Sequence, residues 1–401
     1  MNPVLNPYSP GAGTQPPELA GRDELLNKAS IALQRIASGK FGKSLILTGL
    51  RGVGKTVLLN RIRLNAEAGK LITVRIEAPE GRSLPALLAP GLNAALTKLS
   101  FGKAVTEVVR MSFRALAAFV RVMKFKYNDI EVGFDHETDS DLEEQSMGAD
   151  LDHELISLFQ SVGQAAKENE TVIVLFIDEL QLLDEKQLAS LIMALHVAAQ
   201  DLLPITLMAA GLPQIAAKMG RAKTYAERLF EFVEIGPLNR DFAEKALVIP
   251  AEKLDVSYTK EALEEIVKQT QGYPYFLQEW GKNAWDIADQ SCITEDEAKR
   301  ATVQAIADLD ASFFRVRFDQ LTPVQKYYLR AMAELGSEPV ASGKIAEIMG
   351  KKVTDLGPVR EQLINKGLLY SPIHGETAFT VPLFDSFMKR IMKISYKQQD
   401  H

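Results

Sequence analysis

The stretch from residue 44 to residue 63 constrains the fold of this chain more than any other part of the sequence. Residues 49–56 read GLRGVGKT and match the pattern G-x-x-x-x-G-K-[ST]. An apolar run at residues 45–47 precedes them and apolar residues at helical spacing follow, which predicts a strand, a glycine-rich loop and a helix. Glycines allow a tight turn whose backbone N–H groups approach phosphate oxygens. The stretch therefore predicts a P-loop that binds a nucleotide.

Two positions of this loop have specific expected roles. Lys55 places a positive charge near the β- and γ-phosphates, and Thr56 offers a hydroxyl to Mg²⁺. The other contacts are expected from the loop backbone and the first turn of the helix. The predicted nucleotide-binding residues of this stretch are Gly49, Arg51, Gly52, Val53, Gly54, Lys55, Thr56 and Val57.

A second part of the predicted site follows residues 171–178, which read TVIVLFID. This apolar run, rich in β-branched residues, is typical of a strand covered on both faces of a parallel sheet. A P-loop NTPase needs one carboxylate for the Mg²⁺ shell and another to orient the attacking water. Asp178 fits the first role and Glu179 the second, so Glu179 and Lys55 are the catalytic candidates, and Thr56 and Asp178 the metal ligands. The alternative is an acidic pair that only ends a strand.

Composition limits the classes of protein to which the chain can belong. With 401 residues, 46% of them apolar and 24% charged, it is expected to form two or three globular domains. It has no apolar run near the ~20 residues of a membrane helix, no secretory signal pattern, and one cysteine, Cys292. We therefore expect a cytoplasmic protein with no membrane partner and no disulfide framework.

Strand and helix patterns alternate through the first half of the chain, which predicts an α/β fold with a parallel sheet. Residues 1–17, rich in Pro, Gly and Asn, are expected to be an extended segment. The α/β nucleotide-binding domain is predicted at 18–237, with an insertion at about 101–150, and a helical domain at 238–310. Residues 311–401 read as three short helices and two strands, the outline of a winged helix.

The order of these parts resembles an AAA+ ATPase of the initiator (origin-recognition) and STAND-like group, in the form of a bacterial ATP-binding protein with a C-terminal winged helix. The resemblance rests on AGRDEL at 20–25, the P-loop, VLFIDELQ at 174–181 and the G-x-P segment at 272–274. It implies an AAA+ P-loop NTPase fold, a helical lid domain, and ATP with Mg²⁺ as cofactors. It also implies nucleotide contacts from Leu19, Ala20, Gly21, Arg22 and Pro274. A surface charge at the start of a helix is the alternative for Arg22.

The chain departs from the family pattern at both phosphate sensors. The strand that usually ends in a polar sensor 1 residue ends here in MAAGLP, at 208–213, and Tyr275 stands where a sensor 2 arginine is common. We therefore expect ATP hydrolysis that is slow or stimulated by a partner. Arg228 resembles an arginine finger acting in trans, which implies an ATP-dependent homo-oligomer; Arg221 is the second choice, and local pairing with Glu227 or Glu231 is the alternative.

The expected partner of the C-terminal domain is either DNA or a protein. Residues 311–401 carry 13 basic and 9 acidic side chains, although the whole chain has a net charge of −6. The candidate DNA contacts on the predicted recognition helix are Lys351, Lys352, Arg360 and Lys366. The primary hypothesis is a DNA-associated ATPase switch. The alternatives are a signalling or defence switch whose winged helix binds protein, and a nucleotide-binding regulator that hardly hydrolyses.

A basic stripe along residues 103–124 has three interpretations. Its members, Lys103, Arg110, Arg114, Arg121 and Lys124, fall within one arc of a helix, opposite apolar residues. The stripe could be the solvated face of a packed helix, a contact to a nucleic-acid backbone, or a dock for an acidic partner such as residues 135–154.

Overall fold

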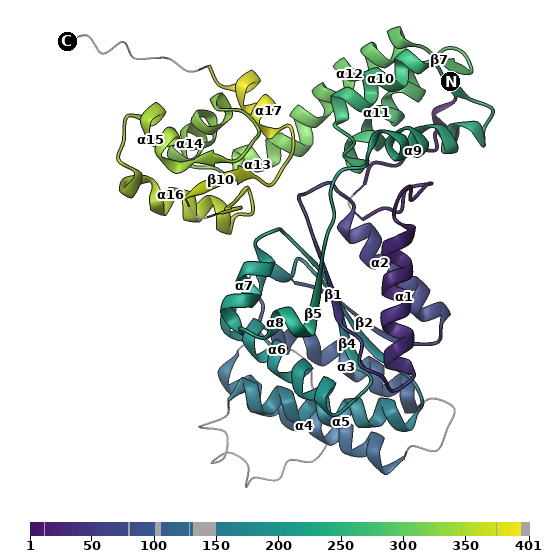
Figure 1. The fold of residues 1–401 in the computed structure, drawn as a ribbon, viewed down its shortest axis with the longest axis vertical. Coiled ribbons are helices and arrows are strands. Elements are labelled where there is room, and N and C mark those ends of the chain that lie inside the picture. Colours follow the sequence, from purple (N-terminus) through teal and green to yellow (C-terminus); the bar gives the residue numbers. More distant parts are fainter. Residues whose placement is uncertain are drawn as a thin grey trace.

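The computed structural model describes residues 1–11, 13–78, 81–100, 106–127, 129–130, 150–373 and 375–393, with the backbone alone for Phe125. The chain forms an α/β part, a helical part and a C-terminal part, which lie below, upper right and upper left in Figure 1. None of the helices within these ranges is both long and apolar enough to cross a membrane.

A parallel sheet forms the centre of the α/β part. Its 5 strands have the order β2-β3-β4-β1-β5, and every neighbouring pair is parallel. The P-loop stretch contributes the strand β1, and the TVIVLFID stretch contributes β3. The strands are β1 (Ser44–Thr48), β2 (Ile72–Glu77), β3 (Ile173–Asp178), β4 (Ile205–Gly211) and β5 (Phe230–Glu234). This sheet confirms the predicted fold class, an α/β P-loop NTPase core.

Helices cover both faces of the sheet (Figure 1). One face packs on α1 (Asp23–Ala37) and α2 (Lys55–Ala68), and the other on α3 (Leu84–Ser100), α5 (Leu151–Glu168) and α6 (Glu185–Gln200). Helix α4 (Glu107–Lys126) packs on α3 and α5. Alternation along β1 explains the two layers, since Leu45 and Leu47 belong to the first core and Ile46 to the second. Shorter elements complete this part: η4 (Leu180–Leu182), α7 (Ile215–Ala222) and α8 (Ala226–Leu229).

Helix α4 carries most of the basic stripe. Its apolar side, including Phe119 and Met123, is buried in the core shared with α3 and α5. Arg110 and Arg114 are exposed and form ion pairs with Glu107, at 3.4 and 3.6 Å. These contacts favour the solvated face of a packed helix. Lys103 and residues 135–149 lie outside the described residues.

The helical part packs against the beginning of the chain. It consists of α9 (Arg240–Glu252), α10 (Lys260–Thr270), α11 (Pro274–Ile287) and α12 (Glu295–Leu309), with paired strands β6 (Ser257–Tyr258) and β7 (Cys292–Ile293). The N-terminal segment, with the short η1 (Pro3–Leu5), lies along these helices. Its Tyr8 is buried and donates a hydrogen bond to the Leu247 carbonyl, and the Trp285 indole donates to the Asn2 carbonyl at 3.0 Å.

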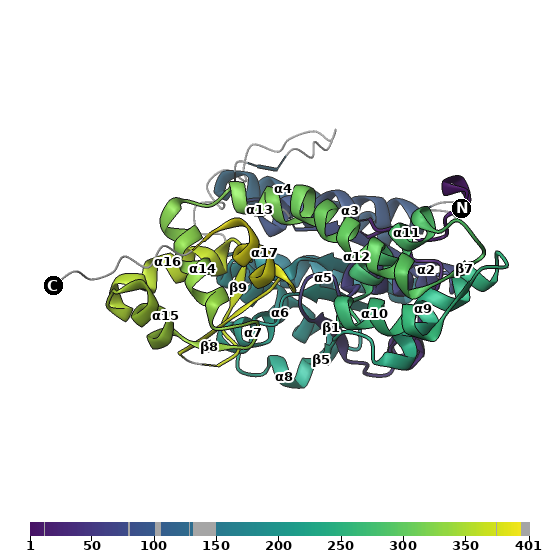
Figure 2. The same ribbon diagram turned by 90° about the horizontal axis from the view of Figure 1, so that it is seen from above.

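The C-terminal part continues from α12 without a break. A π-helical turn η5 (Asp310–Phe314) and then α13 (Arg315–Asp319) extend the same helical path, which crosses the molecule in Figure 2. The elements that follow are α14 (Pro323–Glu334), β8 (Val340–Ala341), α15 (Ser342–Met349), α16 (Val353–Asn365), β9 (Leu369–Tyr370), β10 (Glu376–Phe379) and α17 (Phe384–Ile391). The 3 strands form an antiparallel sheet in the order β8-β10-β9. Phe314 stacks on Phe387 with ring centroids 5.2 Å apart, so the helical and C-terminal parts share one core.

Candidate nucleotide-binding site

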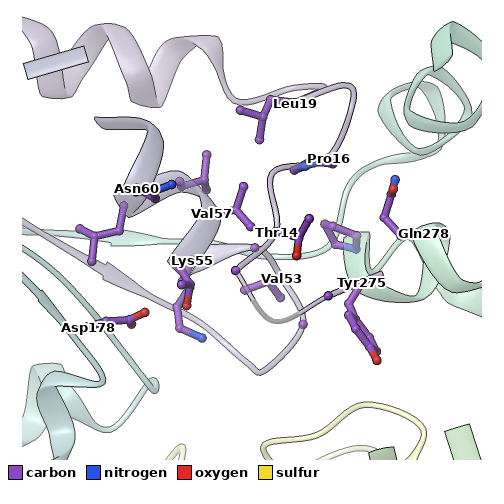
Figure 3. Close-up of a pocket in the computed structure, with 18 of the residues that line it drawn as sticks. Thr14, Pro16, Leu19, Val53, Lys55, Val57, Asn60, Asp178, Tyr275 and Gln278 are labelled. Carbon is purple, nitrogen blue, oxygen red and sulfur yellow. The ribbon is translucent and has the colours of Figure 1, made fainter. Parts of the chain in front are cut away.

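A cavity of about 560 Å³ lies where the parts of the molecule meet. The P-loop, the start of α2 and the end of β3 line one side. Residues of α11 line the other, and the N-terminal segment crosses between them (Figure 3). The carboxyl ends of β2 and β3 open into this cavity, as expected for a ligand site in a parallel sheet.

The P-loop connects β1 to α2 in a conformation that its glycines permit. Gly54 has a φ of 90°, in the left-handed region, and directly precedes the first helical residue, Lys55. Gly49 lies against the end of β5, where a side chain would collide with the carbonyl of Ile235. Gly49 therefore shapes the loop but does not line the cavity, whereas residues 51–57 all do.

Lys55 is buried at the floor of the cavity. Its ammonium donates a hydrogen bond to the Leu50 carbonyl at 2.8 Å, which holds the side chain under the loop. Burial is the main cause that lowers the pKa of Lys55 to about 8; the nearby Glu179 acts against this fall, and Arg51 contributes to it. A bound anion would stabilise the charged form of this lysine.

Asp178 and Thr56 face each other across the cavity floor. Burial raises the pKa of Asp178, and hydrogen bonds from the Thr56 hydroxyl and the Glu179 N–H act against that rise. A carboxylate beside a hydroxyl is a set of hard oxygen ligands, which suits Mg²⁺. The described residues contain no cluster of three or more His, Cys, Asp or Glu side chains able to hold a metal ion. A metal here would thus depend on this pair and on phosphate oxygens.

Glu179 follows at the end of β3, with a φ of 52° that turns its side chain back toward the P-loop. Its carboxylate forms an ion pair with Arg51 at 3.5 Å and accepts a hydrogen bond from the Gln181 amide. The side-chain amide oxygen (Oε1) of Gln181 in turn accepts the Leu212 N–H at 3.0 Å, just after β4. Gln181 therefore links Glu179 to the end of the strand that carries no polar sensor residue. No sequence pattern distinguishes Gln181 as a site residue.

The residues before α1 lie at the rim of the cavity. Leu19, Ala20 and Arg22 line it, whereas Gly21 faces away, against the ring of Phe242. The Arg22 guanidinium is half-buried and donates to the Gly236 carbonyl at 2.7 Å, and burial lowers its pKa. These are the contacts of a half-buried side chain, not of a free surface charge.

The helical part closes the cavity from the opposite side. Pro274 begins α11 and lines the cavity, and the Tyr275 N–H donates to the Gly52 carbonyl at 3.1 Å. Gln278 lies one turn further along the same helix (Figure 3). The lid side of the site is thus hydrogen-bonded to the P-loop itself.

Several lining residues carry no signal of their own in the sequence. Thr14 and Pro16 come from the N-terminal segment, and Phe313 and Arg317 from the helical path that leads into the C-terminal part. None of them stands in a recognisable motif, because the fold brings them to the P-loop from distant positions in the chain. The proline-rich composition of residues 1–17 was the one available signal, since it indicated an extended segment able to cross a surface.

The remaining predicted site residues lie away from the cavity. Arg228 is exposed on α8, with no ion pair among the described residues, and Arg221 pairs with Glu185 at 3.8 Å. In the C-terminal part, Lys351 and Lys352 are exposed just before α16. Arg360 donates to Thr377, Ser371 and the Glu376 carbonyl, and Lys366 donates to the Gln320 carbonyl, so both hold the part together internally.

Comparison with known families and proteins agrees with this arrangement. Residues 18–208 match the family described as "AAA ATPase domain", and residues 311–388 match a "Domain of unknown function (DUF8462)". An uncharacterized HTH-type transcriptional regulator of Methanocaldococcus jannaschii is 24% identical over 222 residues, which is 53% of each chain. The chain thus spans about half the length of this curated relative.

Two solved structures match the chain over most of its length, at low similarity. The Aeropyrum pernix Orc1 protein in complex with DNA is 13% identical with a TM-score of 0.46, over 94% of each chain. The Thermotoga maritima RuvB Holliday junction branch migration motor is 17% identical with a TM-score of 0.45, over 98% of this chain and 99% of that one. Likeness at this level supports no inference about function. The geometry of the candidate site agrees with the match of residues 18–208 to the AAA ATPase domain family.

Proposed function

We propose that this protein binds ATP with Mg²⁺ in the cavity between the AAA ATPase domain and the helical part, and hydrolyses it slowly. The observation that carries the proposal is the convergence of Lys55, Thr56, Asp178 and Glu179 on one cavity that Pro274 closes from the helical side. In this proposal residues 18–237 are the nucleotide-binding domain, 238–310 the lid and 311–401 a winged helix.

Each of these side chains has a task set by its surroundings. The P-loop N–H groups and Lys55 bind the phosphates, and Thr56 and Asp178 hold Mg²⁺, which neutralises charge on the phosphate oxygens when bound. Leu19, Ala20 and Arg22 line the rim, where the base and ribose would lie. Glu179 orients the attacking water after its ion pair with Arg51 opens, and this extra step is consistent with slow hydrolysis.

The contacts around Arg51 support a nucleotide-dependent switch. The Arg51 N–H donates to the Thr380 carbonyl at 2.9 Å, and its guanidinium donates to the Gly367 carbonyl at 3.4 Å. The P-loop is thus bonded to the C-terminal part at a position where phosphate would bind. Nucleotide that competes for this loop would shift the population between docked and released C-terminal arrangements.

Turnover by wild-type protein and by Glu179→Gln tests the enzymatic proposal. Loss of a positioned general base typically slows a reaction by about 10²–10⁴-fold, so the variant should lose hydrolysis while retaining ATP binding. Glu185→Gln, an exposed glutamate at the start of α6, is the matched control and should turn over like wild type. If wild type and Glu179→Gln hydrolyse ATP at equal rates, the enzymatic proposal is wrong and the protein is a nucleotide-binding regulator.

The switch would act on DNA through the C-terminal part. Helices α14 to α16 followed by strands β9 and β10 are compatible with a winged helix, and Lys351 and Lys352 are its exposed candidate contacts. The match to an HTH-type regulator adds support. The second candidate, a signalling or defence switch that binds protein, is favoured by the internal bonding of Arg360 and Lys366, which takes two basic side chains out of a DNA surface.

Binding to duplex DNA across a salt series separates these two functions. If phosphate contacts hold the DNA, affinity falls steeply with salt, and replacing both Lys351 and Lys352 by Gln flattens the slope by roughly two units. Replacing Lys40 by Gln, at an exposed position between α1 and β1 in the α/β part, is the control and should leave the slope unchanged. Absence of binding at low salt would exclude the DNA function and leave the protein-binding one.

Assembly into an ATP-dependent homo-oligomer completes the proposal. Arg228 is exposed next to the edge strand β5, and in this proposal its guanidinium acts as an arginine finger on a neighbouring subunit's nucleotide. Arg221 is less suited, because Glu185 already pairs with it.

A further inference from the structure

The helical path from the lid to the C-terminal part carries an arginine into the candidate nucleotide site. Phe313 lies in the π-helical turn η5 and Arg317 one turn later in α13, and both line the cavity. π-Helical turns within longer helices are rare and concentrate at functional sites. The same stretch includes exposed Arg315, which does not line the cavity.

A row of stacked side chains joins Arg317 to the P-loop. The Arg317 guanidinium lies 4.1 Å from the centroid of the Phe313 ring, and Phe313 stacks on Tyr275 with centroids 5.0 Å apart. The Tyr275 N–H donates to the Gly52 carbonyl in the P-loop. This row fixes the guanidinium beside the phosphate end of the cavity, where Glu179 and Arg51 are its charged neighbours.

The charge of Arg317 is only partly compensated. Its guanidinium donates one hydrogen bond, to the Phe313 carbonyl, and forms no ion pair among the described residues. Burial lowers the pKa of Arg317 to about 10, and Arg51 adds to the effect, so the group stays charged at neutral pH at a cost in stability. Together with Arg51 and Lys55, Arg317 brings three cationic side chains to the phosphate end of the cavity, where Asp178 and Glu179 are the neighbouring carboxylates. A half-buried site with this balance favours an added anion.

We propose that Arg317 contacts the terminal phosphate of bound ATP in cis, supplying the cation that Tyr275 does not provide on the lid. This inference rests on the proposed binding of ATP and adds a residue that no motif of the chain marks. Because Arg317 belongs to the path into the C-terminal part, its contact would report the presence of the γ-phosphate directly to that part. The fork of guanidinium N–H donors suits phosphate oxygens.

Comparison of ATP and ADP affinities tests this assignment. In Arg317→Gln, ATP binding should weaken by at least about tenfold, the loss typical of a charged hydrogen-bond partner, while ADP binding changes little. Arg315→Gln is the matched control on the same helix and should bind both nucleotides like wild type. Arg317→Lys keeps the charge without the fork and should lose less affinity for ATP than Arg317→Gln.

The possible outcomes are distinct. If Arg317→Gln binds ATP as wild type does, or loses ATP and ADP equally, the assignment to the terminal phosphate is wrong while nucleotide binding stands. If wild-type protein binds neither nucleotide, the proposed function fails and the inference with it. Retained ADP binding shows that the variant folds. Should it not fold, Phe313→Leu, which removes the supporting ring, must show the same selective loss for ATP.

Discussion

Arg360 lies between helix α16 and the strands that follow it. Its guanidinium donates to the Thr377 hydroxyl at 2.6 Å, the Ser371 hydroxyl at 2.8 Å and the Glu376 carbonyl at 2.8 Å. The side chain is half-buried, and three acceptors converge on it from β10 and the loop before it. This geometry makes Arg360 a structural link within the C-terminal part.

Replacing Arg360 by Ala should therefore destabilise the C-terminal part. The variant leaves acceptors without a donor, and we expect the free energy of unfolding to fall by about 1–3 kcal/mol. Calorimetric or denaturant unfolding measures the change. Lys352→Ala, at an exposed position, is the control and should stay within about 0.5 kcal/mol of wild type. If the Arg360 variant is as stable as the control, Arg360 does not hold the C-terminal part together and is again a candidate DNA contact.

The residues proposed to bind phosphate and metal and to act in hydrolysis could be predicted, because they lie in short contiguous motifs. Lys55, Thr56, Asp178 and Glu179 each follow a recognisable strand, and strand ends in a parallel sheet meet at one edge. Arg317, Thr14 and Gln181 could not be predicted in the same way. Their positions depend on how the helical path, the N-terminal segment and the turn after β3 fold onto the P-loop, and periodicity does not encode such contacts.

At the scale of elements, the N-terminal segment works as a strap on the helical part. The Tyr8 ring is buried against Gly281, where a Cβ would lie 2.8 Å from it, and the Tyr258 hydroxyl donates to the Tyr8 hydroxyl at 2.8 Å. A few residues later Thr14 and Pro16 line the cavity. The strap thus connects the packing of α9 and α11 to the site.

Truncation of the Tyr8 ring should loosen this strap. Tyr8→Ala removes a buried aromatic side chain, which typically costs about 3–5 kcal/mol, whereas Tyr8→Phe loses only the hydroxyl hydrogen bonds, about 1 kcal/mol. Thermal unfolding of both variants measures which substitution destabilises the protein more, and we expect the larger loss for Tyr8→Ala. Val4→Ala, at a position 89% exposed in the same segment, serves as the control. If Tyr8→Ala melts like Val4→Ala, the segment is not anchored as described.

Element types were easier to predict than their arrangement. The strands β1 and β3 match the segments predicted at 45–47 and 171–178, since each is a clear apolar run. The sheet order was not predictable, because β4 and β3 lie between β1 and β2, which are neighbours in sequence. The helical path through η5 also continues across residue 310, where a domain boundary was predicted.

At the scale of the whole molecule, one cavity is shared by every part of the chain. The α/β part supplies the P-loop and the acidic pair, the helical part supplies Pro274 and Tyr275, and the path to the C-terminal part supplies Arg317. The C-terminal part also accepts a hydrogen bond from the backbone of the P-loop. A ligand in this cavity would therefore influence the relative positions of all three parts.

The central claim is that ATP occupies this cavity, and titration calorimetry with ATP and Mg²⁺ tests it most directly. We expect one ATP per chain for wild-type protein. Binding should weaken by at least about tenfold in Lys55→Ala, because a buried cation facing the phosphates is lost, and should be unchanged in the exposed control Lys40→Ala. No binding by the wild-type protein, or equal affinity in wild type and Lys55→Ala, would contradict the account.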